Sequence, residues 1–393
     1  MEGLIEYIHL PGEIRYINDL VLVSVVFKLQ HTLIDRVKEN YGYWLWISVV
    51  VLFVFDICTA IVNLVSPLLV IWAIRNTFRG IVYMFCVIAT VHANEVNHLF
   101  RVMLYLQIPN LLLAIFQFLV TSHGDQDLVH GLFANGAGSN TFSAMLLAYY
   151  LNLYLNKKGS LIPLGFVLTS SVVIATMAEE KTFFAYLIVI LLVSILISRR
   201  SFKTFFFICF ATIASFLLYN FIMNIRPDLL TFFSDPNAST EYLTATWSGS
   251  YGIPRIGAFK YISQIFFQNN PIVELVGFGF GSGEHAQFSF LDSPFFIKYG
   301  TLMYRNFTHQ WTFIETGYVG FILLIGIFVS AFFCLIRRRS LYKVNNNVLN
   351  ITAMCMCFVC ILSMWSNATL KLDAAYIPYF GVAIGFLSLE RIR

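Results

Sequence analysis

The chain has 393 residues, of which 58% are hydrophobic and 12% are charged, and its formal net charge is +4. Soluble domains average about 25% charged residues, so this composition excludes a soluble globular protein. The basic residues occur as short anchors beside apolar runs, which gives no argument for a nucleic-acid partner.

Apolar runs of about 14 to 26 residues recur along the whole chain, and polar stretches separate them. Because lipid offers the backbone no hydrogen-bond partner, these runs predict helices. We expect an all-α polytopic membrane protein with about twelve transmembrane helices. The predicted spans are 16–30, 44–61, 62–75, 79–93, 102–121, 137–154, 160–176, 181–198, 204–223, 310–336, 347–363 and 372–389. The runs 62–75 and 79–93 are short for a crossing, so 44–93 could instead hold two long helices or a broken pair.

The positions of Lys and Arg in short loops predict the orientation, because such loops stay on the cytoplasmic side. Basic residues gather at 157–158, 199–203, 337–343 and 391–393. By alternation, both termini are expected in the cytoplasm, and 224–309 becomes a large periplasmic loop between 1–223, with about nine helices, and 310–393, with about three. The exception is the segment 31–43, which this scheme places outside despite Arg36 and Lys38.

All seven cysteines fall inside predicted helices, including Cys355, Cys357 and Cys360 in one apolar run. No His or carboxylate accompanies that run, so we interpret these thiols as small apolar side chains. The sequence predicts no metal site and no cofactor.

Ionisable residues beside the predicted external face are candidates for function, because charge near lipid is costly. Lys181 follows two glutamates in a turn between apolar runs, where it could also simply cap a hairpin in water. Arg255 lies in the segment 252–266, in which Ile256, Phe259 and Ile262 recur at helical spacing. That spacing predicts an amphipathic helix on the membrane surface, where Arg255 is either a functional group or an interfacial anchor.

Residues 277–283 read GFGFGSG, with alternating glycines and no Lys-Ser/Thr pair of a nucleotide-binding loop. Backbone N–H groups at Gly279, Gly281 and Ser282 could approach an anion or a sugar closely, although a tight connector needs such glycines as well. Glu284 and His285 follow this turn and are further candidates by position alone.

The segment 304–320 combines Arg305, His309 and Glu315 at the external start of a predicted helix. Histidine titrates near neutral pH and is a common general base, although a lone histidine is more often structural. Gly317 and Gly320 have the spacing of a close helix contact, in which Glu315 could also have only a packing role.

The order of Arg255, the glycine-rich turn, His309-Gln310 and the segment 315–320 resembles the Wzy/WaaL superfamily of O-antigen polymerases and O-antigen ligases. The segment GLFANGAGSN at 131–140 and the Lys181 turn also stand where that family has polar landmarks. The chain departs from the family pattern at Gln310, where Asn is common, and at Lys181, where Arg is common. Lysine keeps the charge but lacks the bidentate fork of arginine.

The resemblance implies a GT-C-like, metal-independent inverting glycosyltransferase of the bacterial inner membrane. Its substrate would be an undecaprenyl-pyrophosphate-linked glycan, and the family also admits membrane lipid and a chain-length regulator protein as partners. In this light His309, Arg255 and Glu315 are expected to be catalytic. The residues expected to bind pyrophosphate or sugar are Lys181, Arg305, Gly279, Gly281 and Ser282.

Three alternatives remain beside an O-antigen, capsular or exopolysaccharide polymerase. An O-antigen ligase would use the same donor and transfer the polymer to the lipid A core. A flippase or exporter for lipid-linked sugars would suit twelve helices equally, but the sequence has no clear internal repeat. A non-catalytic scaffold would leave the polar clusters at Lys181, Arg255 and His309 without a reason.

Overall fold

The computed structural model describes residues 14, 16–40, 42–121, 128–133, 135–197, 252–286, 288–341 and 347–387, with the isolated residues 235–237, 240 and 244. Within these ranges every regular element is a helix and none is a strand. The predicted helix 204–223 and the beginning of the predicted periplasmic loop lie outside the described residues.

The N-terminal half forms a series of helices from α2 to α9. They are α2 (Ile17–Leu29), α3 (Leu33–Glu39), α4 (Tyr43–Val62), α5 (Pro67–Thr90), α6 (Ala93–Phe116), α7 (Gly136–Leu155), α8 (Leu161–Met177) and α9 (Lys181–Ile197). Three short helices, α13 (Ala258–Ile265), α14 (Pro271–Val276) and α15 (Pro294–Tyr299), form a cap. The chain then continues through α16 (Thr308–Leu341), α17 (Asn347–Ser366) and α18 (Tyr376–Ala383).

Five helices of the described part are long and apolar enough to cross a membrane, or six if the bent pair α2 and α3 is one span. They are Tyr43–Val62, Pro67–Thr90, Ala93–Val120, Thr308–Arg339 and Val348–Ser366. The helices α8, α9 and Tyr376–Phe386 are apolar but shorter. The expected all-α class therefore agrees with the structure, whereas about twelve spans are not reached within the described ranges.

The predicted helices 62–75 and 79–93 are one continuous helix, α5, so the segment 44–93 holds two long helices. The polar residues Arg75, Asn76 and Arg79 lie within α5, where Asn76 and Arg79 are buried and Arg75 is partly buried. A polar helix face lowers hydropathy as much as a loop does, which is why the sequence pattern divided this helix.

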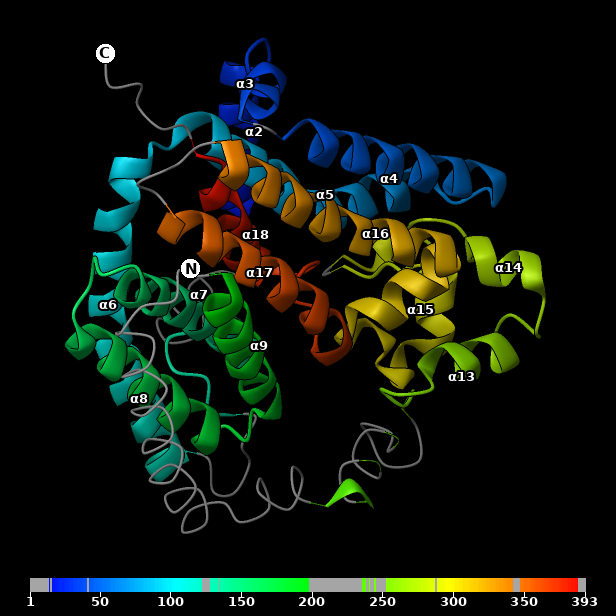
Figure 1. Cartoon of the computed structure of the whole chain (residues 1–393). Helices are drawn as coiled ribbons and strands as arrows, with labels where there is room; N and C mark the ends of the chain where they lie inside the picture. The colour runs from blue at the N-terminus through cyan, green and yellow to red at the C-terminus, as the bar shows by residue number, and fades with distance from the viewer. Residues whose placement is uncertain are drawn as a thin grey trace.

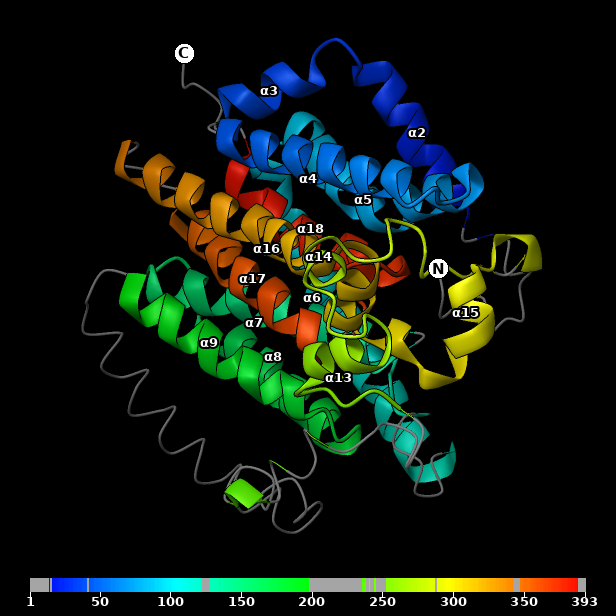
Figure 2. The ribbon, with the colours of Figure 1, turned by 90° about the vertical axis from the view of Figure 1, so that its right-hand side faces the viewer.

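The helices form a bundle in which α16 packs against α4 and α17, and α17 packs against α7 and α9 (Figures 1 and 2). From Gly138 to Asn152 every side chain of α7 is buried. Small residues such as Ser139, Ser143 and Ala144 allow the neighbouring helices to approach it closely. The core of the bundle is therefore centred on α7, α16 and α17.

One end of the bundle gathers basic side chains. Arg338 donates to the carbonyls of Gly385 and Leu387, Arg339 donates to Ile197 O at 2.6 Å, and Arg36 donates to Ala89 O. Arg36 therefore lies at the same end of the bundle as Arg338 and Arg339.

From the sequence we expected both termini on one side of the membrane. The first and last described residues lie at opposite ends of the bundle. The first turn of α2 contacts Arg75 through Asp19, near the beginning of α5. The final described residue, Leu387, contacts Arg338 at the basic end. Helix α2 therefore starts at the opposite end, beside the cap (Figure 2).

The cap packs on the first turns of α16. Two residues of the expected apolar face differ in burial. Ile262 of α13 is fully buried, whereas Ile256 precedes the helix and is 52% exposed. Phe259 packs against the rings of Phe313 and Phe321 of α16, with centroid distances of 4.5 and 5.2 Å. Helix α13 is thus part of a folded cap.

Helix α16 is broken at Gly317, where φ is 62° and ψ is −161°. The break removes helical donors from the carbonyls of Ile314 and Glu315. The backbone N–H groups of Phe278 and Gly279 donate to these two oxygens, each at 2.9 Å. The glycine-rich turn therefore supplies hydrogen-bond donors to the broken helix, as buried backbone carbonyls require.

Candidate functional site

A cavity of about 430 Å³ lies between the cap, α5 and the turn that follows α17. Four cationic side chains line it, and no carboxylate does so among the described residues. These side chains are Arg75, Arg79, Arg305 and Lys371. A cavity lined by fixed cations with hydrogen-bond donors is suited to an anion, and above all to a phosphate.

Two of the cations come from one face of α5, because Arg75 and Arg79 are four residues apart. Arg75 forms an ion pair with Asp19 at 2.7 Å and donates to Asn76 Oδ1 at 3.0 Å. Arg79 lies over the ring of Tyr376 at 5.6 Å. These contacts fix the guanidinium groups beside the cavity before any ligand arrives.

The other two cations lie near the indole of Trp311. Arg305 is 4.1 Å and Lys371 is 4.5 Å from the ring centroid, so both make cation–π contacts. Lys371 also forms a buried ion pair with Glu315 at 2.9 Å. Arg305 is 3.5 Å from a carboxylate oxygen of Glu284. The indole of Trp311 thus makes cation–π contacts with two positively charged side chains at once.

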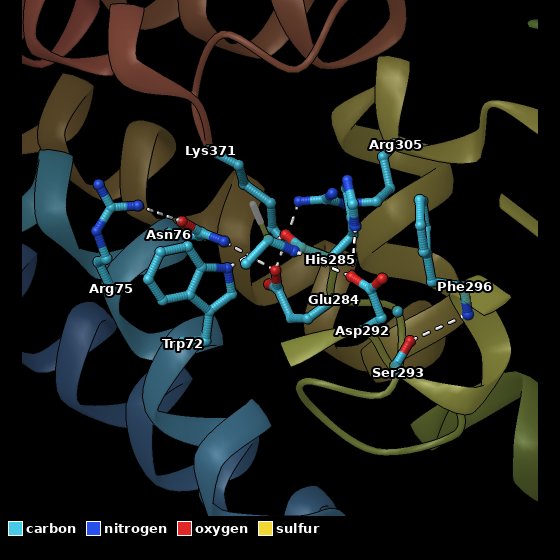
Figure 3. Close-up of polar contacts among 12 residues, drawn as sticks. Trp72, Arg75, Asn76, Glu284, His285, Asp292, Ser293, Phe296, Arg305 and Lys371 are labelled. Carbon is cyan, nitrogen blue, oxygen red and sulfur yellow. Dashed lines mark hydrogen bonds and ion pairs between the residues drawn. The ribbon is translucent and has the colours of Figure 1, made fainter. Parts of the chain in front are cut away.

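Glu284 connects the two halves of the cluster (Figure 3). It is fully buried and accepts a hydrogen bond from Asn76 Nδ2 at 2.8 Å. Burial, and next the charge of Glu315, raise its pKa from 4.5 to about 8, although Arg305 and Lys371 act in the opposite direction. The raised pKa favours the uncharged carboxyl, which leaves more of the positive charge of the cavity uncompensated.

This raised pKa gives stability a pH dependence. Folding takes up a proton at Glu284 wherever the folded carboxyl is protonated and the unfolded one is ionised, which is between about pH 4.5 and about pH 8. We expect the free energy of unfolding to fall as pH rises through this window. In Glu284→Gln the fall should be shallower, as measured by detergent titration at several pH values; an unchanged slope would contradict the assignment.

His285 also lines the cavity, and its ring is paired with Asp292 through Nδ1 at 2.5 Å. The imidazole stacks on Phe296 with a centroid distance of 3.9 Å and an interplanar angle of 12°. Its carbonyl accepts a hydrogen bond from Trp72 Nε1 at 3.2 Å, which connects the cap to α5.

The structure brings together only some of the residues expected to form a site. Arg305 lines the cavity, and Glu315 lies behind it, bonded to Lys371. Gly279 and Gly281 have φ values of 99° and 91° and pack against the ends of α4 and α5, so they serve the tight connection. The hydroxyl of Ser282 is buried.

His309 and Arg255 form a separate contact outside the cavity lining. His309 is 1% exposed, with Nδ1 2.9 Å from Met364 O and Nε2 3.1 Å from Arg255 O. Both ring nitrogens therefore face backbone carbonyls, and the side chain connects the cap to α17. The Arg255 guanidinium lies 5.2 Å from the ring centroid of Phe307.

Lys181 begins α9 and forms an ion pair with Glu179 at 3.0 Å. It is not one of the residues that line the cavity. Its helix packs against α7 and α17, whereas the cavity is formed by α5, the cap and the turn after α17. Lys181 thus stands at the first position of α9, where it pairs with a residue of the preceding turn.

Sequence reasoning missed Arg75, Arg79, Lys371 and the buried Asp56 of α4. The available signal was ionisable residues inside apolar runs, which lipid tolerates only where they face protein or water. Among the described residues, no group of three His, Cys, Asp or Glu side chains is arranged to hold a metal ion. Cys355, Cys357 and Cys360 are buried in the core, in agreement with their interpretation as packing residues.

No protein-family model matches the chain, and a search of curated proteins finds no significant match.

Proposed function

We propose that this protein is a multi-pass membrane glycosyltransferase that takes its donor sugar from a lipid pyrophosphate, and that the cationic cavity holds the pyrophosphate. The observation that carries the proposal is the lining of four cations without a carboxylate in the described structure. The motif order that resembles the Wzy/WaaL superfamily supports the same chemistry.

The cavity lies at the cap end of the bundle, opposite the basic anchors at Arg338 and Arg339. Because basic anchors stay in the cytoplasm, this end would face the periplasm of a bacterial inner membrane. A lipid-linked donor could then keep its chain in the bilayer while its pyrophosphate enters the cavity. Arg75, Arg79, Arg305 and Lys371 would stabilise the charge that develops on the leaving phosphate.

The reaction that we propose is polymerisation of undecaprenyl-pyrophosphate-linked repeat units for O-antigen, capsule or exopolysaccharide. A chain rich in aromatic residues, at 17%, suits an enzyme matched to one particular repeat unit, because aromatic rings stack on sugar faces. An O-antigen ligase would use the same cavity and differ in its acceptor, the lipid A core.

A transporter of lipid-linked sugars is the second candidate, and one observation favours it. The Lys371–Glu315 ion pair is fully enclosed beside the break in α16. Broken helices with buried charges are typical of the substrate sites of secondary transporters. The cavity lies beside this ion pair, because Lys371 lines the cavity and also forms the pair with Glu315.

The test uses cells that lack this protein and measures their surface glycan ladder after complementation. Arg75→Gln and Arg305→Gln should each weaken binding of undecaprenyl pyrophosphate to the purified protein about 10- to 100-fold, because each removes a charge-assisted contact. Both variants should also shorten or abolish the ladder. Lys298→Ala removes an exposed cation of the same cap and is the matched control.

The outcomes separate the candidates. A core carrying one repeat unit in the deletion strain indicates a polymerase, whereas a bare core with accumulated lipid-linked polymer indicates the ligase. Accumulation of lipid-linked single units on the cytoplasmic face supports the transporter. An unchanged ladder in the deletion strain rules out all three, and wild-type binding by both arginine variants rules out the cavity.

A further inference from the structure

His285 and Asp292 form a hydrogen-bonded pair at the edge of the cationic cavity (Figure 3). We infer that His285 is the general base that activates the acceptor hydroxyl, and that Asp292 is its positioning residue. This inference rests on the proposed glycosyl transfer and assigns to it a residue other than His309.

The contact with Asp292 selects the tautomer of the imidazole. A carboxylate accepts hydrogen bonds, so a neutral His285 carries its proton on Nδ1, where it donates to Asp292, and presents Nε2 as the acceptor. Among the described residues Nε2 has no hydrogen-bond partner. The His285 side chain is 40% exposed, so a substrate hydroxyl can reach it. A base needs this combination of a fixed tautomer and access.

Neighbouring groups support the pair. Asp292 Oδ1 also accepts from the backbone N–H of Ala286 at 3.4 Å, and Ser293 N donates to Glu284 O at 2.9 Å, so the loop closes on itself. Phe296 supports the imidazole face. A base held in one orientation loses little entropy when it reacts.

The other candidate bases of the region are already engaged. Both ring nitrogens of His309 face backbone carbonyls, and that residue is outside the cavity lining. Glu315 accepts from Lys371 Nζ and Gly283 N, and Asp19 accepts from Arg75. Among the described residues that line the cavity His285 is the one histidine, and its Nε2 is not engaged by any of them.

The acceptor hydroxyl oxygen forms a bond to the anomeric carbon while the bond from that carbon to the phosphate oxygen breaks. The pyrophosphate leaves with the electron pair, near Arg305 and Lys371. The hydroxyl proton passes to His285 Nε2, and the Asp292 carboxylate stabilises the resulting imidazolium.

The experiment measures the rate at which surface polymer appears after the protein is induced in deletion cells. His285→Gln should reduce this rate about 100-fold or more, the usual contribution of a general base. Its affinity for undecaprenyl pyrophosphate should stay at the wild-type value, because the cations are intact. Asp292→Asn should also slow the rate without weakening binding, and Asp292→Glu should restore part of it.

His98→Gln, an exposed histidine of α6, is the matched control and should behave as wild type. If His285→Gln makes polymer at the wild-type rate, the base is not His285, while the proposed function stands. Loss of undecaprenyl pyrophosphate binding in His285→Gln would show a structural role and overturn the inference. If the wild-type protein makes no polymer in deletion cells, the proposed function itself fails.

Discussion

Lys371→Ala is expected to destabilise the protein by about 3–5 kcal/mol, the usual cost of leaving a buried charge without its partner. Lys371 is 2% exposed and Glu315 is fully buried, so removal of the ammonium leaves the Glu315 carboxylate enclosed. Its remaining hydrogen bond from Gly283 N, at 3.3 Å, is too long to compensate. The free energy of unfolding, measured by detergent titration in mixed micelles, tests this.

The double variant Glu315→Gln with Lys371→Met separates charge from packing, because it removes both charges and keeps most of the volume. We expect it to be clearly more stable than Lys371→Ala alone. The exposed Lys298 provides a control, since Lys298→Ala should change stability by less than about 0.5 kcal/mol. Equal losses in Lys371→Ala and Lys298→Ala would show that the ion pair contributes nothing.

Gly317→Ala is expected to destabilise the protein by at least about 3 kcal/mol. The backbone at this position has φ 62° and ψ −161°, a region that only glycine adopts readily. A Cβ atom there would lie 2.5 Å from the Glu274 carbonyl oxygen and from backbone atoms of Leu275. Backbone atoms cannot move aside as a flexible side chain can, so α14 would have to separate from α16.

Gly326→Ala is the comparison within the same helix. A Cβ atom at Gly326 meets nothing within 4 Å, and its backbone is helical. Alanine favours helix over glycine by up to about 1 kcal/mol, so this variant should be neutral or slightly stabilised. Thermal unfolding of both purified variants in one detergent makes the comparison. Equal midpoints would mean that the break at Gly317 is not required.

The sequence predicted the bounds of some helices to within one residue. The run 44–61 corresponds to α4 at Tyr43–Val62, and 137–154 corresponds to α7 at Gly136–Leu155. The prediction failed in α5, where Arg75 and Arg79 lower the hydropathy of a helix whose polar face is turned inward. Hydropathy reports composition, and it cannot distinguish a loop from a helix that faces a cavity.

The candidate site was less predictable, because its contacts join residues distant along the chain. Asn76 meets Glu284, and Lys371 meets Glu315, through tertiary packing that no local pattern encodes. The sequence did draw attention to Arg305 and Glu315, since charges beside apolar helices are costly. It also drew attention to His309, but residue type alone could not show that both ring nitrogens face carbonyls.

The break in α16 has a consequence for the order of synthesis. The two carbonyls exposed by Gly317 depend on N–H groups of Phe278 and Gly279, which precede α16 in the chain. Because synthesis proceeds from the N-terminus, these donors already exist when α16 emerges from the ribosome. No later segment of the chain is therefore needed to cover the exposed backbone of this helix.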